Sequence, residues 1–289
     1  MIDPGLEGRS ALVTGANHGI GAATAEALAA QGAAVCLAYY REPTSYGREE
    51  LAAAREKGEG GEALYRAMQQ QPAEPIAEGI RTRGGKAAAV ELDLGDAANI
   101  PRLFDRCEAE VGPVDVLINN HAFCELETFD PALVTDRPFP VRLPTAEVID
   151  RHFGVNARSC ALMMREYFER FLKRRAGWGR IINVSTDAAH SHVANVSYAA
   201  SKHAIESYSR SAACELGKYG ITVNILSPGP IQTGYIVPDM EAAIRSEAPL
   251  RRVGRPEDVA PVMVFLASEQ AHWVTGQLIY VGGGWRMHQ

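Results

Sequence analysis

Short apolar runs alternate along the chain with longer stretches in which alanine, leucine and charged residues recur at helical spacing. We predict strands at residues 10–15, 33–40, 87–94, 114–120, 179–186, 221–229 and 277–284. Several of these runs are apolar at consecutive positions, which indicates that both faces of the sheet are covered. The alternation therefore predicts an α/β fold, a doubly wound parallel sheet of seven strands with helices on both faces.

Helices are predicted between these strands, and two of them are long. One spans roughly residues 157–173 and the other roughly 198–216, whereas an earlier alanine-rich helix at 23–32 ends at Gly32. We find no internal repeat and no linker, so residues 1–289 are expected to form a single domain. Two polar segments, at about 43–75 and 125–145, are insertions into this pattern. The second contains four prolines, which exclude a long regular element there.

Composition narrows the class of protein. The chain has 289 residues, of which 46% are hydrophobic and 22% charged, which is typical of a globular protein. Its net charge of −6 does not favour binding to nucleic acid. It has no apolar leader core at its start and no run of ~18 apolar residues, so no membrane span is expected. Five scattered cysteines without a C-x-x-C pair are typical of reduced thiols, which favours a cytoplasmic location. We predict no metal site.

A glycine-rich stretch, TGANHGIG at residues 14–21, joins the first strand to the first helix. Gly15, Gly19 and Gly21 would permit a tight turn and let backbone N–H groups approach a pyrophosphate. The positive end of the helix would stabilise that anion. The position of the stretch favours a dinucleotide site over an ordinary connecting loop.

The sequence YAASK at residues 198–202 places a tyrosine and a lysine on one helical face. An ammonium group beside a phenol lowers the phenol's pKa, which would let Tyr198 exchange a proton near neutral pH. A tyrosine and a lysine four residues apart are weak support when taken alone.

The ordered set of motifs is more specific. TGANHGIG, NN at 119–120, Asn156, ST at 185–186, YAASK and SPGPIQT at 227–233 follow one another at a spacing that resembles the short-chain dehydrogenase/reductase family, including its 3-oxoacyl-[acyl-carrier-protein] reductase-like members. The resemblance covers about residues 10–284. It implies a Rossmann fold, binding of NAD(H) or NADP(H), and hydride transfer between nicotinamide and a carbonyl or secondary alcohol, as in a ketoreductase.

The resemblance also implies roles for single residues. Tyr198 and Lys202 are the catalytic pair and also contact the cofactor, and Asn156 anchors a water and the lysine by way of a helix kink. The other cofactor-binding positions are Gly15, Asn17, His18, Gly19, Ile20, Gly21, Asp93, Leu94, Asn120, Pro228, Gly229, Ile231 and Thr233. His121 stands where the family has alanine, and two roles are open for it: packing, or facing the cofactor.

The choice between NAD and NADP depends on the end of the second strand. A carboxylate there would accept a hydrogen bond from the ribose 2′-hydroxyl, whereas a 2′-phosphate needs positive charge. The position is occupied by Tyr39, and Arg41 follows, with His18 as a second possible donor. We therefore predict NADP(H), with NAD(H) possible because Glu42 is near.

Two hydroxyls compete for the role of assisting Tyr198. Spacing to the tyrosine favours Ser185, and alignment of the strand GRIINVST favours Thr186. Because side chains alternate along a strand, only one can face the substrate from an extended segment. Both remain candidates.

Assembly and the insertions give further expectations. Apolar positions on the two long helices, together with the resemblance, predict a homotetramer, or a homodimer. We expect residues 125–145 to border a small-molecule carbonyl or alcohol substrate, and residues 43–75 to lie near the adenosine end or at a subunit edge. A non-catalytic dinucleotide-binding redox sensor is the alternative function.

Overall fold

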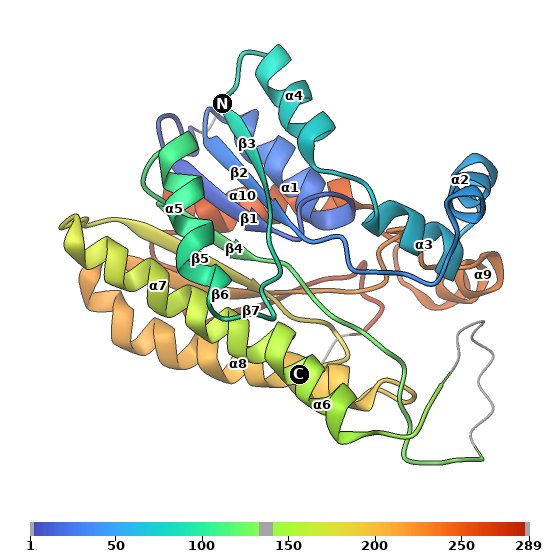
Figure 1. The fold of residues 1–289 in the computed structure, drawn as a ribbon. Coiled ribbons are helices and arrows are strands. Elements are labelled where there is room, and N and C mark those ends of the chain that lie inside the picture. The colour runs from blue at the N-terminus through green and yellow to red at the C-terminus, as the bar shows by residue number, and fades with distance from the viewer. Residues whose placement is uncertain (1–2, 133–140, 287–289) are drawn as a thin grey trace.

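A seven-stranded parallel sheet forms the centre of the computed structural model, which describes residues 3–132 and 141–286 (Figure 1). Its strands are β1 (Ser10–Thr14), β2 (Ala34–Tyr39), β3 (Ala87–Glu91), β4 (Val116–Asn119), β5 (Gly179–Val184), β6 (Ile221–Pro228) and β7 (Leu278–Val281). They lie in the order β3-β2-β1-β4-β5-β6-β7, and every neighbouring pair is parallel. The predicted doubly wound sheet is confirmed.

Both faces of the sheet are buried, as the apolar runs predicted. Along β1, Ala11 and Val13 pack into one core and Leu12 packs into the other. Alternation along β4 is the same, with Val116 and Ile118 on one side and Leu117 on the other. Burial of successive strand residues against two cores explains why these strands carry no polar face.

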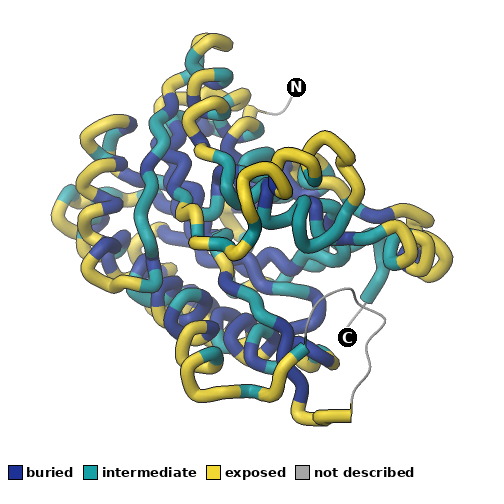
Figure 2. The backbone as a smooth tube through the Cα atoms, turned by 45° about the vertical axis from the view of Figure 1, so that its right-hand side comes forward, coloured by how far each residue is buried: buried dark blue, intermediate teal, exposed yellow. Residues whose placement is uncertain are grey.

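Helices cover the two faces in two layers. One layer contains α1 (Gly19–Ala29), α4 (Glu74–Thr82) and α10 (Pro256–Ala267), and the other contains α5 (Asn99–Val111), α7 (Ser159–Lys173) and α8 (Val196–Leu216). Figure 2 shows the buried residues concentrated in the interior of the molecule and the exposed residues on its outer turns.

The helix before β5 is interrupted. It begins as α6 (Ala146–His152), continues as a π-helical turn at Phe153–Arg158 and then runs on as α7. A π-turn holds an extra residue within the helix, and such turns are frequent at functional sites. The helix kink expected at Asn156 is therefore a π-helical turn in this structure.

The insertion at residues 43–75 is largely helical and lies on the carboxyl side of the sheet. It contains α2 (Arg48–Lys57) and α3 (Glu62–Gln69), which stand beside α9 (Pro238–Glu247) in Figure 1. The Gly61 N–H donates to the Gly234 carbonyl at 2.8 Å, so the insertion joins the segment that follows β6. Residues of the insertion line the cavity that contains Tyr198 and also the one that contains Asn17 and Tyr39, and its place near the adenosine end or at a subunit edge stays a prediction.

The insertion at 125–145 is described only in part, since residues 133–140 lie outside the described ranges, with Pro138 and Pro140 among them. Glu127 and Arg142 form a parallel bridge that holds its two ends together. Within the described ranges, no helix is both long and apolar enough to cross a membrane. All five cysteines are free thiols.

Candidate active site

The glycine-rich turn leads from β1 into α1 with a backbone that suits glycine. Gly15 and Gly19 have φ values of +62° and +55°, which side chains with a Cβ rarely adopt. A Cβ on Gly21 would lie 2.1 Å from the Gly15 carbonyl oxygen, so the turn closes tightly on the helix. No side chain caps the N-terminus of α1, and its first turn has no acidic residue. These N–H groups suit an anion such as a pyrophosphate.

A cavity of about 640 Å³ runs along the carboxyl edge of the sheet from Tyr39 to Lys202. The residues predicted for the site that line it are Gly15, Asn17, His18, Gly19, Ile20, Tyr39, Asp93, Leu94, Asn120, His121, Ser185, Tyr198, Lys202, Pro228 and Thr233. An adjoining cavity is lined by Gly229 and Ile231. Gly21, Arg41, Asn156 and Thr186 line neither. The uncapped helix and the elongated cavity fit a dinucleotide.

Arg41 does not face this cavity. Its guanidinium donates to both carboxylate oxygens of Glu91, at 2.9 and 2.7 Å. Glu91 is opposite Tyr39 in the register of β2 and β3, which brings the pair together at the sheet edge. The positive charge expected for a 2′-phosphate is thus already paired. Burial also lowers the pKa of His18 to about 4, so that ring is neutral near pH 7.

Side-chain bonds to the backbone fix the residues around the turn. The Asn120 amide donates to the carbonyls of Thr14 and Gly15, both at 3.1 Å. His121 has one ring nitrogen 2.7 Å from the Thr14 hydroxyl and the other 2.6 Å from the Ser159 hydroxyl. Burial, followed by the charge of Lys202, lowers its pKa to about 3. His121 therefore acts as a neutral bridge from β1 to α7, and its ring also lines the cavity.

Tyr198 and Lys202 lie together at the inner end of the cavity. The lysine ammonium is 5.7 Å from the tyrosine ring centroid and donates to the Val184 carbonyl at 2.8 Å. Asn156, in the π-turn, accepts from the Phe123 N–H at 2.7 Å and donates to the Ser201 hydroxyl at 2.9 Å. The structure therefore brings the catalytic helix and the π-turn into contact through Ser201, the neighbour of Lys202.

The expected lowering of the tyrosine pKa by Lys202 is not found. Burial is the largest influence and raises the pKa of Tyr198, and charge on Cys124, Tyr65 and Asp187 adds to the rise. Burial also lowers the pKa of Lys202, to about 8. Desolvation outweighs the attraction because both groups are enclosed. The phenol is protonated near neutral pH.

The two candidate hydroxyls have different partners. Ser185 donates to a carboxylate oxygen of Glu206 at 2.8 Å, and Glu206 is only 1% exposed on α8. The Thr186 hydroxyl contacts the Asp187 carboxylate at 3.4 Å. Ser185 is thus held toward α8, on the face that Asn183 also uses to reach Ser209.

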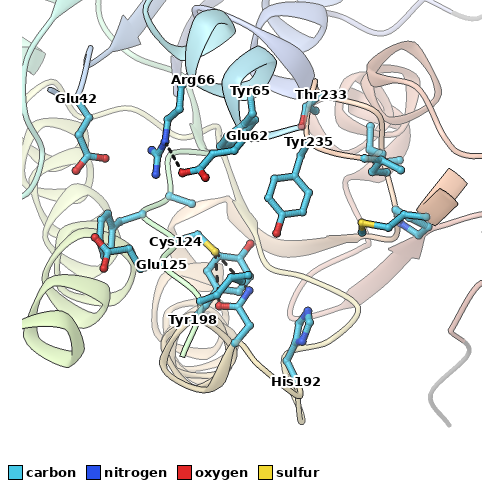
Figure 3. A pocket seen from close by; sticks show the side chains of 18 of the residues that line it. Glu42, Glu62, Tyr65, Arg66, Cys124, Glu125, His192, Tyr198, Thr233 and Tyr235 are labelled. Carbon is cyan, nitrogen blue, oxygen red and sulfur yellow. Dashed lines mark hydrogen bonds and ion pairs between the residues drawn. The ribbon is translucent and has the colours of Figure 1, made fainter. Parts of the chain in front are cut away.

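A second cavity of about 780 Å³ opens outside Tyr198. Tyr65, Glu62 and Arg66 of α3 form one part of its wall, and Glu125 and Tyr235 form others (Figure 3). Sequence reasoning missed the contribution of α3. The stretch EALYRAMQ predicts a helix, but periodicity carries no information on where a long insertion docks.

Comparison with known proteins agrees with this arrangement. The model of the enoyl-(acyl carrier protein) reductase family matches residues 50–286. A short-chain type dehydrogenase/reductase from Picea abies is 34% identical, over 96% of this chain and 93% of its own length. An NADPH-dependent aldehyde reductase-like protein of Arabidopsis thaliana is 32% identical, over 97% and 95%. The crystal structure of a 3-oxoacyl (acyl-carrier-protein) reductase from Agrobacterium tumefaciens with NADP bound has a TM-score of 0.77 at 28% identity, over 98% and 96%.

The fold, the glycine-rich turn and the tyrosine–lysine pair define a dinucleotide-dependent oxidoreductase. With relatives above 30% identity along nearly its whole length, the chain belongs to the short-chain dehydrogenase/reductase family.

Proposed function

We propose that the protein is an NADP(H)-dependent ketoreductase. The observation that carries this proposal is the position of Tyr198, which lines both the cofactor cavity and the outer cavity. A carbonyl oxygen placed beside that phenol would have its carbon next to the nicotinamide end of the cofactor cavity. Bound NADPH would supply the hydride.

The residues of the chain would supply the proton and the geometry. Tyr198 would donate its proton to the substrate oxygen as negative charge develops there, and its raised pKa suits an acid in the reductive direction. Lys202 would hold the nicotinamide ribose, anchored at the Val184 carbonyl. Asn156 would position the catalytic helix through Ser201. Thr186 or Ser185 would donate a hydrogen bond to the same substrate oxygen.

Similar proteins that use or contain NADP(H) favour this cofactor over NAD(H) for the present chain. The relative from Arabidopsis thaliana is NADPH-dependent, and the structure from Agrobacterium tumefaciens contains NADP. At the adenosine end, Arg41 would pair with a 2′-phosphate by giving up its ion pair with Glu91. A steady-state comparison of kcat/KM for NADPH and NADH tests the choice, and an NADH preference above about tenfold contradicts it.

We propose cytoplasmic homotetramers, built on α7 and α8. Leu172 and Tyr208 are 46% and 48% exposed on these helices, and such apolar surface suits a subunit contact. Light scattering at micromolar concentration tests the assembly, and a monomer would contradict it.

Steady consumption of NADPH separates the ketoreductase from a redox sensor. Purified protein is mixed with NADPH and a panel of ketones and β-ketoacyl thioesters, and the absorbance of NADPH is followed over many turnovers. A sensor would bind NADPH without consuming it. Retained NADPH binding with no turnover on any carbonyl compound would overturn the proposal.

A further inference from the structure

The insertion at residues 43–75 is fixed to the active site on two sides. The Asn17 amide of the glycine-rich turn donates to the carbonyls of Gln69 and Gln71, at 2.8 and 2.9 Å. On the other side, Gly61 donates to Gly234. The insertion is therefore a built part of the cavity wall.

Tyr65 is the residue of this insertion that stands where the two cavities meet. Its ring packs edge-on against His18 at 5.8 Å and against Tyr235 at 5.7 Å. Tyr65 lines both cavities, as Tyr198 does. In Figure 3 the two tyrosines approach the cavity from opposite sides.

The Tyr65 hydroxyl can serve as a donor to a ligand. Arg66 donates to the Gln69 side-chain oxygen at 3.0 Å, which leaves the Gln69 amide nitrogen on the side of the Tyr65 phenol, one helical turn away. Among the described residues no side chain or carbonyl accepts the phenol hydrogen, so that hydrogen is left for a ligand. Burial, the largest influence, raises the pKa of Tyr65 to about 12, so this hydrogen is retained near neutral pH.

Charges in the outer cavity largely neutralise one another. Six charged side chains of its wall form three pairs: Glu62 with Arg66 at 3.8 Å, Asp187 with Arg286 at 3.9 Å, and Glu42 with Arg151. Two further carboxylates of the wall, Glu125 and Asp239, have no ion-pair partner among the described residues, and they add negative charge. Of the arginines that line it, Arg142 has no carboxylate partner among the described residues, and it is exposed. An anionic substrate would need an unpaired cation in the enclosed part of the wall. An uncharged substrate with hydrogen-bonding oxygens fits better.

We propose that Tyr65 is a specificity-determining residue that donates a hydrogen bond to a second oxygen of the substrate, next to the carbonyl that Tyr198 protonates. The preferred substrates are uncharged ketones with a hydroxyl or carbonyl group on the adjacent carbon. Tyr65 keeps its proton throughout, while hydride reaches the carbonyl carbon and the Tyr198 proton reaches its oxygen. The inference rests on the proposed ketoreductase function.

Three ketones of similar shape test the proposal. 2-Hydroxyacetophenone carries the adjacent hydroxyl, propiophenone has a methyl group in its place, and benzoylformate carries a charge. We expect wild-type kcat/KM with NADPH to be about tenfold higher for 2-hydroxyacetophenone than for propiophenone, since one hydrogen bond distinguishes the two. Benzoylformate also offers acceptor oxygens, and we expect it to be a poorer substrate than 2-hydroxyacetophenone because no unpaired cation among the described residues of the enclosed wall would receive its charge. Tyr65→Phe should remove most of that preference and leave propiophenone within about twofold.

Tyr219→Phe is the matched control, because Tyr219 is a half-exposed phenol that lines neither cavity. It should keep the wild-type preference, and thermal melts with NADPH titrations show whether Tyr65→Phe keeps its fold and cofactor affinity. An equal loss on both neutral ketones, no preference in the wild type, or a preference for benzoylformate overturns the role of Tyr65 while the ketoreductase stands. If the wild type consumes no NADPH with any carbonyl compound, the proposed function fails and takes this inference with it.

Discussion

The inner and outer ends of the active-site cavity are held in place by different kinds of contact. At the inner end, the main anchors are bonds from side chains to backbone atoms, Asn156 to Phe123, Lys202 to Val184 and Asn120 to Gly15, and side-chain pairs such as Asn156 with Ser201 add to them. At the outer end, side chains meet side chains, as Tyr65 meets Tyr235 and Glu62 meets Arg66. Backbone positions follow from the fold, so the inner end is set by the sheet and its helices. The outer end depends on the identity of a few side chains, and substrate choice belongs there.

The largest expected effect is at the inner end. Tyr198→Phe removes the proton donor and should lower kcat by about 10²–10⁴-fold. The factor should be the same for every ketone, because the proton is needed by all of them. Steady-state kinetics on at least two ketones, with NADPH titration as the binding control, measure it. A loss of kcat below tenfold, or one that differs strongly between ketones, would contradict the role of Tyr198 as the common proton donor and would give it a role in substrate choice.

The assisting hydroxyl should give the next largest effect. Ser185 lines the cofactor cavity, but its hydroxyl donates to the buried Glu206 carboxylate, and such charge-assisted bonds are strong. Thr186 lines neither cavity, yet its hydroxyl donates only over 3.4 Å, to Asp187 of the outer wall, so we expect Thr186 to turn toward a bound substrate. Thr186→Val should lower kcat by about 10²–10³-fold, and Ser185→Ala should change it little. Each variant is assayed with the same ketone. A large loss of kcat in Ser185→Ala with little loss in Thr186→Val would assign the hydrogen bond to Ser185. If both variants keep near wild-type kcat, neither hydroxyl has this role.

His121 should make the protein less stable in acid. Its folded pKa of about 3 lies below the value of 6.5 expected when unfolded, so the unfolded state binds more protons between these values. Stability is therefore lost as the pH falls from 6.5 toward 3, by up to about 2 kcal/mol at pH 5. Urea unfolding at pH 7 and pH 5 measures the loss. His121→Asn cannot titrate, so between pH 7 and pH 5 its free energy of unfolding should fall by about 2 kcal/mol less than that of the wild type. An equal fall in both proteins would contradict the low pKa assigned to His121.

The smallest effect on stability is expected at the outer end. Glu62→Gln removes a loose ion pair, so the free energy of unfolding should change by less than about 0.5 kcal/mol. The variant frees Arg66, and we expect a lower KM for benzoylformate as a result. Unfolding curves and kinetics on the same preparation test both statements. A large loss of stability would mean that the outer wall is as tightly built as the inner end.

The inner end was also the part that the sequence could predict. Tyr198, Lys202 and the glycine-rich turn lie at fixed places relative to strands, and the apolar runs locate those strands. Arg41 shows where such reasoning stops. Its partner Glu91 is fifty residues away in the chain and reaches it only through the register of β2 and β3. Tyr65 is a similar case, because its contacts depend on how α3 docks against the segment after β6.

The π-turn at Phe153–Arg158 makes the active site sensitive to chain length. One residue fewer in this stretch would let α6 and α7 join as a regular helix, turned by about 100° per residue against the present register. The Asn156 amide would then lose its hydrogen bonds to Phe123 and Ser201, even with every other residue of the site unchanged. A single-residue deletion here should therefore be far more damaging than any conservative substitution at the same positions. Libraries that vary this protein by insertion and deletion should leave this segment at its present length.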